Sequence, residues 1–448
     1  METIALILAA GQGTRMKSQT PKVLHPLMGV PLVHYSVETA VKVTGNQPYV
    51  VIGHGAEQVV QALGEEVHFI TQEQQLGTGH AVLQAEQPLM KFEGQVLVIS
   101  ADMPLLRVET LAALVQTQAV NPGPVSLLTV SGVESRGFGR IIRNEQGSIT
   151  AIVEEAQATL RELAVQEYNV GAYCINARWL WAALKKVKKS PKGEYYLTDI
   201  VQIAVEEGLP VQVSAVAEPV EALGINTRQH LAEAEAAMRT RINTQWMLNG
   251  VTMIDPSRVY IEPGVKMEQD CTIWPDTYIK GKTEIGTGCE IGPNTIIESC
   301  KIGKDCRILA SVLESAVLED QVEMGPFCRL RKGAHLASHV HMGNFGEVKD
   351  SYLGEGTKMG HFSYIGNAQI AGDVNIGAGT ITCNYDGVSK HTTIIEEGVF
   401  IGSDTMLVAP VKIGKGATTG AGAVVNRDVA PGEVVVGVPA RPIKKAKS

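Results

Sequence analysis

Aromatic residues, long apolar runs and secretion signals are all scarce or missing in this sequence. Phe, Trp and Tyr together supply only 5% of the 448 residues. No apolar stretch approaches the roughly 18 residues that a membrane-spanning helix needs. The N-terminal residues lack the basic segment that opens a secretory signal peptide. We therefore expect a cytoplasmic protein with no membrane partner.

Paired cysteines and an excess of positive charge are also missing. The seven cysteines are an odd number and contain no Cys-x-x-Cys pair, so they favour neither a disulfide framework nor a structural zinc site. The 39 Lys and Arg residues are outnumbered by 47 Asp and Glu residues, giving a net charge of −8. This balance leaves no broad basic surface, and we expect no nucleic-acid partner.

The sequence does contain the composition of a globular protein of more than one domain. Hydrophobic residues make up 44% and charged residues 19% of the chain, which excludes extended disorder. The length is about three times the roughly 150 residues of a typical domain. Glycine, with 46 residues, exceeds its usual share of about 7%, and most of this excess lies in the C-terminal half.

The N-terminal half alternates apolar, β-rich runs with amphipathic stretches. Strands are predicted at residues 4–9, 49–52, 67–70, 96–100 and 125–130, and helices at 31–42 and 108–118. Alternation of this kind is typical of an α/β domain with a mostly parallel, Rossmann-like sheet covered by helices on both faces.

A helix without glycine or proline is predicted to join two domains. Apolar residues at three- and four-residue intervals form one stripe: Leu231, Ala234, Met238, Ile242 and Trp246. The predicted organisation is residues 1–226 for the first domain, 227–250 for the linker helix and 251–448 for the second domain.

After the linker, apolar residues recur at every sixth position. The first series is Ile261, Met267, Ile273, Ile279, Ile285, Ile291 and Ile297, and similar series continue to Val425. A six-residue period indicates a parallel β-helix whose coils are triangles of three short strands. The glycines that follow many of these residues, as in Ile285-Gly286 and Ile401-Gly402, are interpreted as corners that need a positive φ.

A candidate phosphate-binding loop follows the first predicted strand. Gly11 and Gly13 resemble a dinucleotide fingerprint, but Met16 occupies the third glycine position and no Walker A lysine follows. The pattern alone fits a phosphate loop or an ordinary tight turn. Arg15 and Lys22 on the same segment favour the first, because fixed cations neutralise phosphate charge.

Two further segments would meet this loop at the carboxyl edge of the sheet. Gly77-Thr78-Gly79 lets a ligand approach the backbone, and Asp102 follows the strand at 96–100. One carboxylate beside substrate phosphates suits Mg²⁺, which keeps much of its water.

The run from Leu8 to Met16, followed by Pro21-Lys22, resembles the signature of sugar-1-phosphate nucleotidylyltransferases. Together with Gln72, the segment at 76–81, Asp102 and the hexapeptide half, the whole chain resembles one bacterial family. Its members combine N-acetylglucosamine-1-phosphate uridylyltransferase with glucosamine-1-phosphate N-acetyltransferase. The resemblance implies a left-handed β-helix, a homotrimer, and UDP-N-acetylglucosamine for peptidoglycan and lipopolysaccharide synthesis.

The resemblance implies the following roles at the first site. Catalytic cations that bind the triphosphate of UTP would be Arg15 and Lys22. Ligands of Mg²⁺ would be Asp102 and Asn226. Residues that contact the nucleotide or its N-acetylglucosamine moiety would be Leu8, Ala9, Ala10, Gly11, Lys22, Gln72, Gly77, Thr78, Gly139, Glu154, Asn169 and Asn226. Ala101 stands where the family has a glycine, a small change beside Asp102.

A polar cluster interrupts the apolar period of the β-helix. It begins near Lys349, includes His361 and Tyr364, and ends in an insertion at residues 384–390. A histidine titrates near working pH and is a candidate general base. A lone histidine on a β-helix surface would be unremarkable, but polar residues one coil further on favour a site, and an extruded loop commonly carries function.

At this second site the resemblance implies that His361 deprotonates the amine of glucosamine-1-phosphate. Residues that bind this sugar phosphate would be Arg331, Lys349, Tyr364 and Asn375. Residues that contact acetyl-CoA would be Ala378, Asn384, Tyr385, Lys390, Ser403 and Ala421. Val438 stands where the family has an arginine, and Arg441 is the nearest cation that could replace it.

Three alternatives remain open at this point. The chain could be another sugar nucleotidylyltransferase whose β-helix is regulatory, or a scaffold whose β-helix only trimerises. A third interpretation is a zinc site in the β-helix, since His335, His339, His341 and His361 lie in neighbouring coils. That last interpretation leaves the N-terminal half unexplained.

Overall fold

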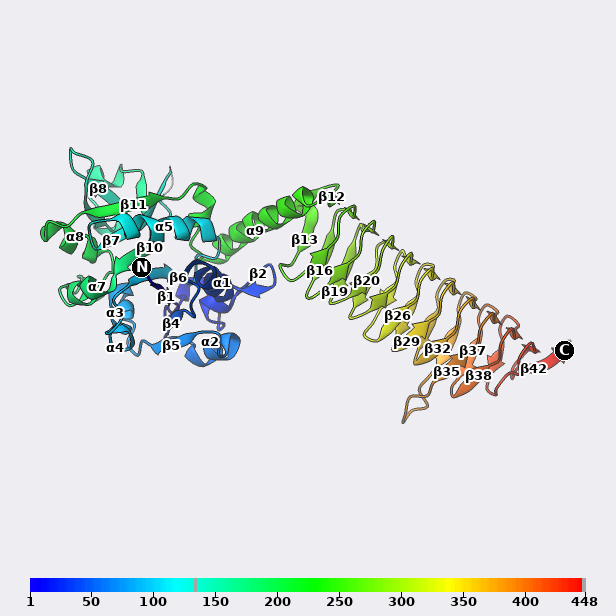
Figure 1. The fold of residues 1–448 in the computed structure, drawn as a ribbon. Helices are drawn as coiled ribbons and strands as arrows, with labels where there is room; N and C mark the ends of the chain where they lie inside the picture. The colour runs from blue at the N-terminus through cyan, green and yellow to red at the C-terminus, as the bar shows by residue number, and fades with distance from the viewer. Residues whose placement is uncertain (133–134, 445–448) are drawn as a thin grey trace. The chain divides into compact units, whose positions relative to one another are not determined.

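The computed structural model describes residues 1–132 and 135–444, and the chain divides into two compact units, Met1–Met238 and Arg239–Ser448 (Figure 1). Helix α9, Arg228–Leu248, contains the division between them. The predicted linker helix is therefore present, while the proposed domain limits at 226 and 250 stay predictions. Among the described residues, no helix combines the length and apolarity needed to cross a membrane.

The first unit is built on one mixed sheet. Its strand order is β11-β7-β10-β6-β1-β4-β5, with β8 paired to β10 and β9 paired to β8. The strands are β1 (Thr3–Leu8), β4 (Tyr49–Ile52), β5 (His68–Thr71), β6 (Gln95–Ser100), β7 (Val125–Ser131), β8 (Arg140–Arg143), β9 (Ile149–Val153), β10 (Glu167–Asn176) and β11 (Val211–Ala215). Strands β6, β1, β4 and β5 are parallel to one another, whereas β10 is antiparallel to both β6 and β7.

Helices cover both faces of this sheet. Successive side chains of a strand point to opposite faces, and both faces of these strands are apolar, so each face is buried under helices. Ile7 belongs to one apolar core and Leu6 to another, and both are fully buried. The helices are α1 (Leu32–Thr44), α2 (Ala56–Leu63), α3 (Thr78–Leu83), α4 (Glu86–Leu89), α5 (Val108–Val120), α6 (Leu160–Leu163), α7 (Ala177–Leu184) and α8 (Asp199–Glu206). A small hairpin, β2 (Pro26–Leu27) and β3 (Val30–Pro31), precedes α1. The predicted α/β class is confirmed.

The second unit is a left-handed parallel β-helix of hexapeptide repeats, visible in Figure 1 as a stack of coils. Three ladders run along it: a 12-stranded sheet from β12 (Thr252–Met253) to β42 (Arg441–Lys444), a 10-stranded sheet from β13 (Val259–Ile261) to β40 (Val424–Val425), and a 9-stranded sheet from β14 (Lys266–Met267) to β38 (Val411–Ile413). Residues of the predicted series, such as Ile279, Ile291 and Leu407, point inward and are fully buried. The six-residue period is thereby confirmed.

The glycines that follow the inward residues have a different role from the one predicted. At Gly286 and Gly402 the backbone does not have a positive φ. Instead, a Cβ at Gly286 would lie 2.8 Å from the backbone of Gly303 in the next coil, and one at Gly402 would lie 2.6 Å from the carbonyl oxygen of Thr419. Positive φ values occur two residues later, as at Gly288 (73°). The interpretation of these glycines as positive-φ corners was wrong, since close stacking of coils excludes a side chain there.

Candidate active sites

A cavity of about 700 Å³ opens at the carboxyl ends of β1, β5 and β6. Every residue proposed for the first site lines it: Leu8, Ala9, Ala10, Gly11, Arg15, Lys22, Gln72, Gly77, Thr78, Asp102, Gly139, Glu154, Asn169 and Asn226. The loops that follow these parallel strands converge at one edge, which is where such sheets bind ligands. Residues separated by more than 200 positions in sequence therefore share one cavity wall.

One end of this cavity concentrates cationic and oxygen-donor groups. The Lys22 Nζ lies 2.5 Å from an Asp102 carboxylate oxygen and 3.2 Å from the Asn226 side-chain oxygen. The Arg15 guanidinium donates a hydrogen bond to the same Asn226 oxygen at 2.9 Å. Burial raises the pKa of Asp102, but attraction and hydrogen bonding from Lys22 and a hydrogen bond from Ser100 outweigh it, so the pKa lies below its usual value. Asp102 is thus held as a carboxylate.

The glycine loop has the geometry of a tight turn that faces the cavity. Gly13 has a φ of 60°, and a Cβ there would lie 2.6 Å from the Cβ of Lys22. A Cβ at Gly11 would meet nothing within 4 Å. The turn brings Lys22 against the loop and leaves the backbone at Gly11 open to a ligand.

The loop at residues 76–79 is fixed from behind by the segment before α8. The Gly77 φ is 101°, and a Cβ there would lie 2.6 Å from the Tyr195 carbonyl oxygen. The Thr78 side chain accepts a hydrogen bond from the Leu197 N–H at 3.0 Å, and the buried Gln72 side chain donates to the Gly77 carbonyl oxygen at 3.2 Å. Glycine at 77 is needed for both conformation and space.

Other residues that line the cavity are neutral or acidic. Glu154 accepts a hydrogen bond from Thr198 at 3.2 Å, and burial raises the pKa of its carboxyl group. The Asn169 side chain donates to the Tyr173 hydroxyl at 2.7 Å, and its N–H donates to the Gly139 carbonyl oxygen at 2.8 Å. The cavity wall therefore offers two cations, which lie beside Asp102 and Asn226, and a second carboxyl group at Glu154.

Strand β10 was absent from the sequence prediction, yet it carries Asn169 and Tyr173. Its pairing with β7 shifts register between these two residues, and Gly171 between them has a φ of 85°. Irregular strands of this kind often re-aim side chains near sites. Thr198 and Tyr173 also line the cavity and were not predicted. The Tyr-rich, alternating run at 167–176 was the signal available for the strand.

In the second unit, four residues of the predicted acetyl-transfer site form one column. His361, Ala378, Ser403 and Ala421 each lie two residues beyond the ends of neighbouring strands β30 (Lys358–Met359), β33 (Asn375–Ile376), β36 (Phe400–Ile401) and β39 (Thr418–Thr419). His361 is exposed, and its Nδ1 is hydrogen-bonded to the Asn344 side-chain oxygen. Asn344, one coil away, was not predicted.

A group of cations lies on the 10-stranded sheet of the β-helix. Arg331 follows β25 (Arg329–Leu330), and its N–H donates at 2.9 Å to Val348, next to Lys349 on β28 (Glu347–Lys349). The Lys390 ammonium, and to a smaller extent Arg331, lowers the pKa of Lys349. Carboxylates also lie beside two of these cations, since Arg331 is paired with Glu347 at 3.1 Å and Lys349 lies 3.7 Å from Asp350.

The other residues proposed for the second site are distributed around this cluster. Tyr364 begins β31 (Tyr364–Gly366) of the 10-stranded sheet, whereas Asn375 lies on the 12-stranded sheet. The insertion is an extruded hairpin, seen in orange in Figure 1, in which Tyr385 bridges Lys390. The Asn384 side chain donates to Asn367 at 2.6 Å. A single chain does not bring Tyr364 and Asn375 onto the same face.

The histidines considered as zinc ligands do not converge. His335 is paired with Glu319 and His341 with Glu323, on strands of two different sheets. His339 occupies a corner with a φ of 60°. Within residues 1–132 and 135–444 there is no group of three or more His, Cys, Asp or Glu residues that could hold a metal ion. The interpretation of these histidines as the ligands of a zinc site was wrong.

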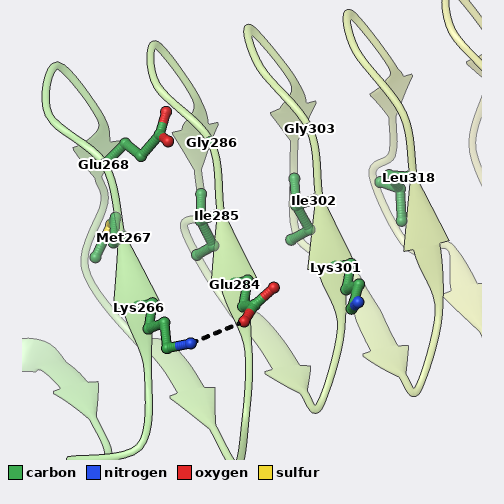
Figure 2. Close-up of a pocket in the computed structure, with 10 residues that line it drawn as sticks. All are labelled: Lys266, Met267, Glu268, Glu284, Ile285, Gly286, Lys301, Ile302, Gly303 and Leu318. Atoms are coloured by element: carbon green, nitrogen blue, oxygen red, sulfur yellow. Dashed lines mark hydrogen bonds and ion pairs between the residues drawn. The ribbon is translucent and has the colours of Figure 1, made fainter.

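A second hollow, of about 600 Å³, lies on the first coils of the β-helix (Figure 2). Gly286 and Gly303 line it, together with the paired Lys266 and Glu284, whose charged groups are 3.1 Å apart. No residue predicted for either site lines this hollow. It is a surface groove between coils and not a candidate active site.

The two positions that depart from the family pattern differ in their surroundings. Ala101 is fully buried, and its N–H donates to the Leu8 carbonyl oxygen at 3.0 Å, so its methyl group packs in the core behind Asp102. Val438 is 74% exposed in the last coil, and Arg441 lies on β42.

A nucleotide-binding α/β sheet joined to a hexapeptide β-helix defines a nucleotidyltransferase that is fused to an acyltransferase. The MobA-like NTP transferase domain family matches residues 5–208, and the bacterial transferase hexapeptide family matches 264–299 and 392–427. The chain belongs to the family of GlmU bifunctional proteins. It is 45% identical over 436 residues to the bifunctional protein GlmU of Geotalea uraniireducens (strain Rf4), covering 96% of this chain and 95% of that protein. It is 44% identical to that of Geobacillus thermodenitrificans (strain NG80-2), covering 98% of this chain and 96% of that protein.

Membership of this family makes the chain a bifunctional enzyme that carries a uridylyltransferase and an acetyltransferase for UDP-N-acetylglucosamine synthesis.

Proposed function

We propose that the two activities reside in the two sites described above and act in sequence. The β-helix acetylates glucosamine-1-phosphate with acetyl-CoA, and the α/β unit then joins the product to UTP. The observation that carries the first assignment is the shared cavity, which every predicted residue of that site lines. The product, UDP-N-acetylglucosamine, enters peptidoglycan and lipopolysaccharide synthesis, and we place the enzyme in the cytoplasm.

At the first site, the nucleotide lies over the segments at 8–11 and 76–79, with Gln72 beneath them. Arg15 and Lys22 bind the triphosphate. A phosphate oxygen of the sugar phosphate attacks the α-phosphorus of UTP in line, and the bond from that phosphorus to the leaving pyrophosphate breaks. Positioning and charge neutralisation carry most of this catalysis, so the protein needs no covalent intermediate.

The loop end also fits a magnesium ion. Asp102 and Asn226 offer a carboxylate and an amide oxygen to the same cation, the Lys22 ammonium, in this structure. Oxygen donors are the ligands that Mg²⁺ prefers, and two of them leave room for phosphate oxygens and water. Bound there, Mg²⁺ would neutralise phosphate charge during transfer. Lys22 would then turn from Asp102 toward the triphosphate.

The carboxyl end of the cavity suits the uncharged acetamido sugar. Glu154 accepts hydrogen bonds from sugar hydroxyl groups, and Asn169, held by Tyr173, offers its remaining amide hydrogen. Glycine is needed at position 139, since a Cβ there would lie 2.8 Å from the Ile152 side chain. A phosphate group would be repelled at this end, so the polarity of the cavity orients the sugar phosphate.

At the second site, His361 acts as the general base. Because Asn344 accepts the Nδ1–H, the basic lone pair of the ring is on Nε2. This nitrogen takes a proton from the amine of glucosamine-1-phosphate as the amine attacks the thioester carbonyl. The C–S bond then breaks, the protonated His361 returns the proton to the leaving sulfur, and CoA leaves as the thiol. Arg331 and Lys349 hold the sugar phosphate, with Tyr364 and Asn375 on the sugar.

Acetyl-CoA would follow the column of small residues that continues from His361. Ala378, Ser403 and Ala421 leave space along this corner, and the hairpin residues Asn384, Tyr385 and Lys390 lie beyond the intervening strand. Small side chains in successive coils make a groove into which an extended cofactor fits. The exposed Val438 supplies no charge for the CoA phosphates, which leaves Arg441 as the nearby cation in the last coil.

A homotrimer completes this site. Phe327, Phe345 and Phe362 form an exposed ladder beside the His361 column, with ring centroids 5.3 and 5.0 Å apart. The three side chains are 61%, 45% and 65% exposed, which is unfavourable unless another surface covers them. The separation of Asn375 from Tyr364 on different sheets also favours a site shared between chains.

Two assays on the same preparation test the proposal. Wild-type enzyme should release CoA thiol from acetyl-CoA only when glucosamine-1-phosphate is present. It should release pyrophosphate from UTP only with N-acetylglucosamine-1-phosphate and Mg²⁺. Pyrophosphate release without any thiol release from the folded protein would instead support a nucleotidyltransferase with a regulatory β-helix. Absence of both would support a scaffold.

A further inference from the structure

His25, which is buried, and Arg228, which is exposed, form a part-buried contact close to the cationic end of the first cavity. The Arg228 Nη1 lies 3.2 Å from the His25 Nδ1, and the two residues are 203 positions apart in sequence. His25 is 5% exposed. Neither residue lines the cavity, and neither has a role in the functions derived so far.

Each partner is attached to a segment that carries a key residue of the site. His25 follows the short 3₁₀ helix Lys22–Leu24, and its N–H donates to the Lys22 carbonyl oxygen at 3.2 Å. Arg228 is the first residue of α9 and lies two residues after Asn226. In front of this contact, Lys22 and Asn226 meet directly at 3.2 Å. Two contacts, one in the cavity and one behind it, therefore join the same two segments.

The chemistry of the pair requires a neutral histidine. A guanidinium can only donate hydrogen bonds, so the Nδ1 must accept and the ring proton is on Nε2. Burial lowers the pKa of His25, and the Arg228 charge lowers it further, against a smaller opposite effect of the Thr20 backbone. The Nε2 is buried without a hydrogen-bond partner, which is unfavourable for stability. The Nδ1 is thus the atom of the His25 side chain that makes the contact with Arg228.

We propose that His25 is a positioning residue for uridylyl transfer: by accepting a hydrogen bond from Arg228, it holds the segment of Lys22 in register with the segment of Asn226. This inference rests on the proposed function of the first site. This contact between His25 and Arg228, which we call the clamp, fixes the spacing between Lys22, a cation for the triphosphate, and Asn226, an oxygen donor for Mg²⁺. A displacement of about 1 Å in such groups can reduce a rate roughly 100-fold.

Two substitutions at one position separate positioning from packing. His25→Leu keeps the bulk but removes the acceptor, and His25→Asn places an amide oxygen near the Nδ1 position. We expect His25→Leu to lower kcat/KM for pyrophosphate release roughly 10- to 100-fold, and His25→Asn to recover it to within about threefold. The Kd for UTP, measured by calorimetry without metal, should weaken in His25→Leu and recover in His25→Asn. His34→Leu, on α1, is the matched control and should behave as wild type.

The opposite partner gives an independent test. Arg228→Met should lower pyrophosphate release as His25→Leu does, and the double variant should lose no more than either single variant, because both remove the same contact. Circular dichroism and the thermal unfolding transition of the α/β unit report whether the part of the chain that carries His25 and Arg228 is folded. If His25→Leu cannot be purified folded, the Arg228→Met and His25→Asn variants still decide the question.

The outcomes distinguish this inference from the proposed function. Wild-type enzyme without pyrophosphate release would contradict the proposed function itself. Normal wild-type activity together with an unimpaired His25→Leu variant would overturn only the clamp. Equal impairment of His25→Asn and His25→Leu, or additive losses in the double variant, would also overturn it, because then the acceptor atom would not matter.

Discussion

The Lys22 ammonium and the Asp102 carboxylate form a buried ion pair at the cationic end of the first cavity, with 14% and 15% of their side chains exposed. The pair joins the loop after β1 to the loop after β6. In the absence of ligand, Lys22 thus compensates a buried negative charge, which would otherwise be unfavourable. In the function that we propose, a bound metal ion would take over this role, and Lys22 would then be available to the phosphates. One residue would thereby serve both states of the site.

Asp102→Ala should abolish uridylyl transfer while leaving acetyl transfer intact. The substitution removes a proposed metal ligand and leaves the Lys22 charge uncompensated, so we expect a loss of at least roughly 1000-fold in pyrophosphate release, in line with the removal of main electrostatic groups from other active sites. Coupled assays for pyrophosphate and for CoA thiol on one preparation check this. Loss of both activities in a folded protein would contradict two independent sites.

His361→Ala should have the reverse effect. Removal of a general base lowers rates by roughly 100- to 10,000-fold, so thiol release that depends on glucosamine-1-phosphate should collapse while pyrophosphate release stays normal. Asn344→Ala should cause a smaller loss, since it removes only the acceptor that fixes the ring proton on Nδ1. An Asn344→Ala loss as large as that of His361→Ala would mean that Asn344 does more than orient the ring.

Glu154→Gln tests the sugar end of the cavity through pH. Because burial raises the folded-state pKa of Glu154, the ionised group destabilises the fold at pH values above that pKa, and this cost disappears as the pH falls below the unfolded value. Glu154→Gln should therefore have a higher Tm than wild type at neutral pH, and the difference should shrink toward pH 4.5.

The same substitution should weaken sugar-phosphate binding, since a neutral amide accepts weaker hydrogen bonds than a carboxylate. We expect the KM for N-acetylglucosamine-1-phosphate to rise roughly 10- to 100-fold, the equivalent of about 1.5–3 kcal/mol for hydrogen bonds to a charged group. The KM for UTP should stay the same. An unchanged sugar KM would remove Glu154 from the binding site, whatever the effect on Tm.

The sequence patterns predicted the architecture and, at the first site, the two glycine loops with Arg15, Lys22 and Asp102, whereas the other residues of that site came from the family resemblance. Short-range signals such as the alternation of strands and helices and the six-residue period predict local structure directly, because each depends on residues close in the chain. Parallel strands then bring their carboxyl ends together, which explains why Gly11, Gln72 and Asp102 share a cavity.

The missed features depend on contacts that a local pattern does not contain. Strand β10 pairs antiparallel between two strands far away in sequence, and its bulge at Gly171 is visible only in the register with β7. Asn344 contacts His361 across a full coil, and Arg228 reaches His25 from 203 residues away. The role of Gly286 depends on how closely the next coil packs. Such relations follow from the fold and not from composition or spacing.

Gly286→Ala should destabilise the β-helix although alanine is a small residue. Its Cβ would lie 2.8 Å from the Gly303 backbone, which cannot move without separating two coils. We expect a loss of about 1–3 kcal/mol in unfolding free energy, as for overpacked cores, and a lower Tm for the β-helix transition. Gly398→Asn is the matched control. Asparagine tolerates the φ of 66° at this position, and a Cβ there would meet nothing within 4 Å. A larger loss at Gly398 would contradict the packing explanation.

Phe345→Asp should dissociate the assembly that we propose around the second site. The ring lies between Phe327 and Phe362 in the exposed ladder, with centroids 5.3 and 5.0 Å away, and a carboxylate at its centre would be costly to bury against another chain. Sedimentation should show trimers for wild type and monomers for Phe345→Asp.

Acetyl transfer should fall with the trimer, because Asn375 and Tyr364 lie on different sheets of one chain and would meet only across an interface, while pyrophosphate release should persist. Leu160→Asp, at a residue 89% exposed in the α/β unit, controls for added charge and should remain trimeric. A trimeric Phe345→Asp variant would exclude the ladder from the interface. A monomer with full acetyl transfer would show that one β-helix contains the whole site.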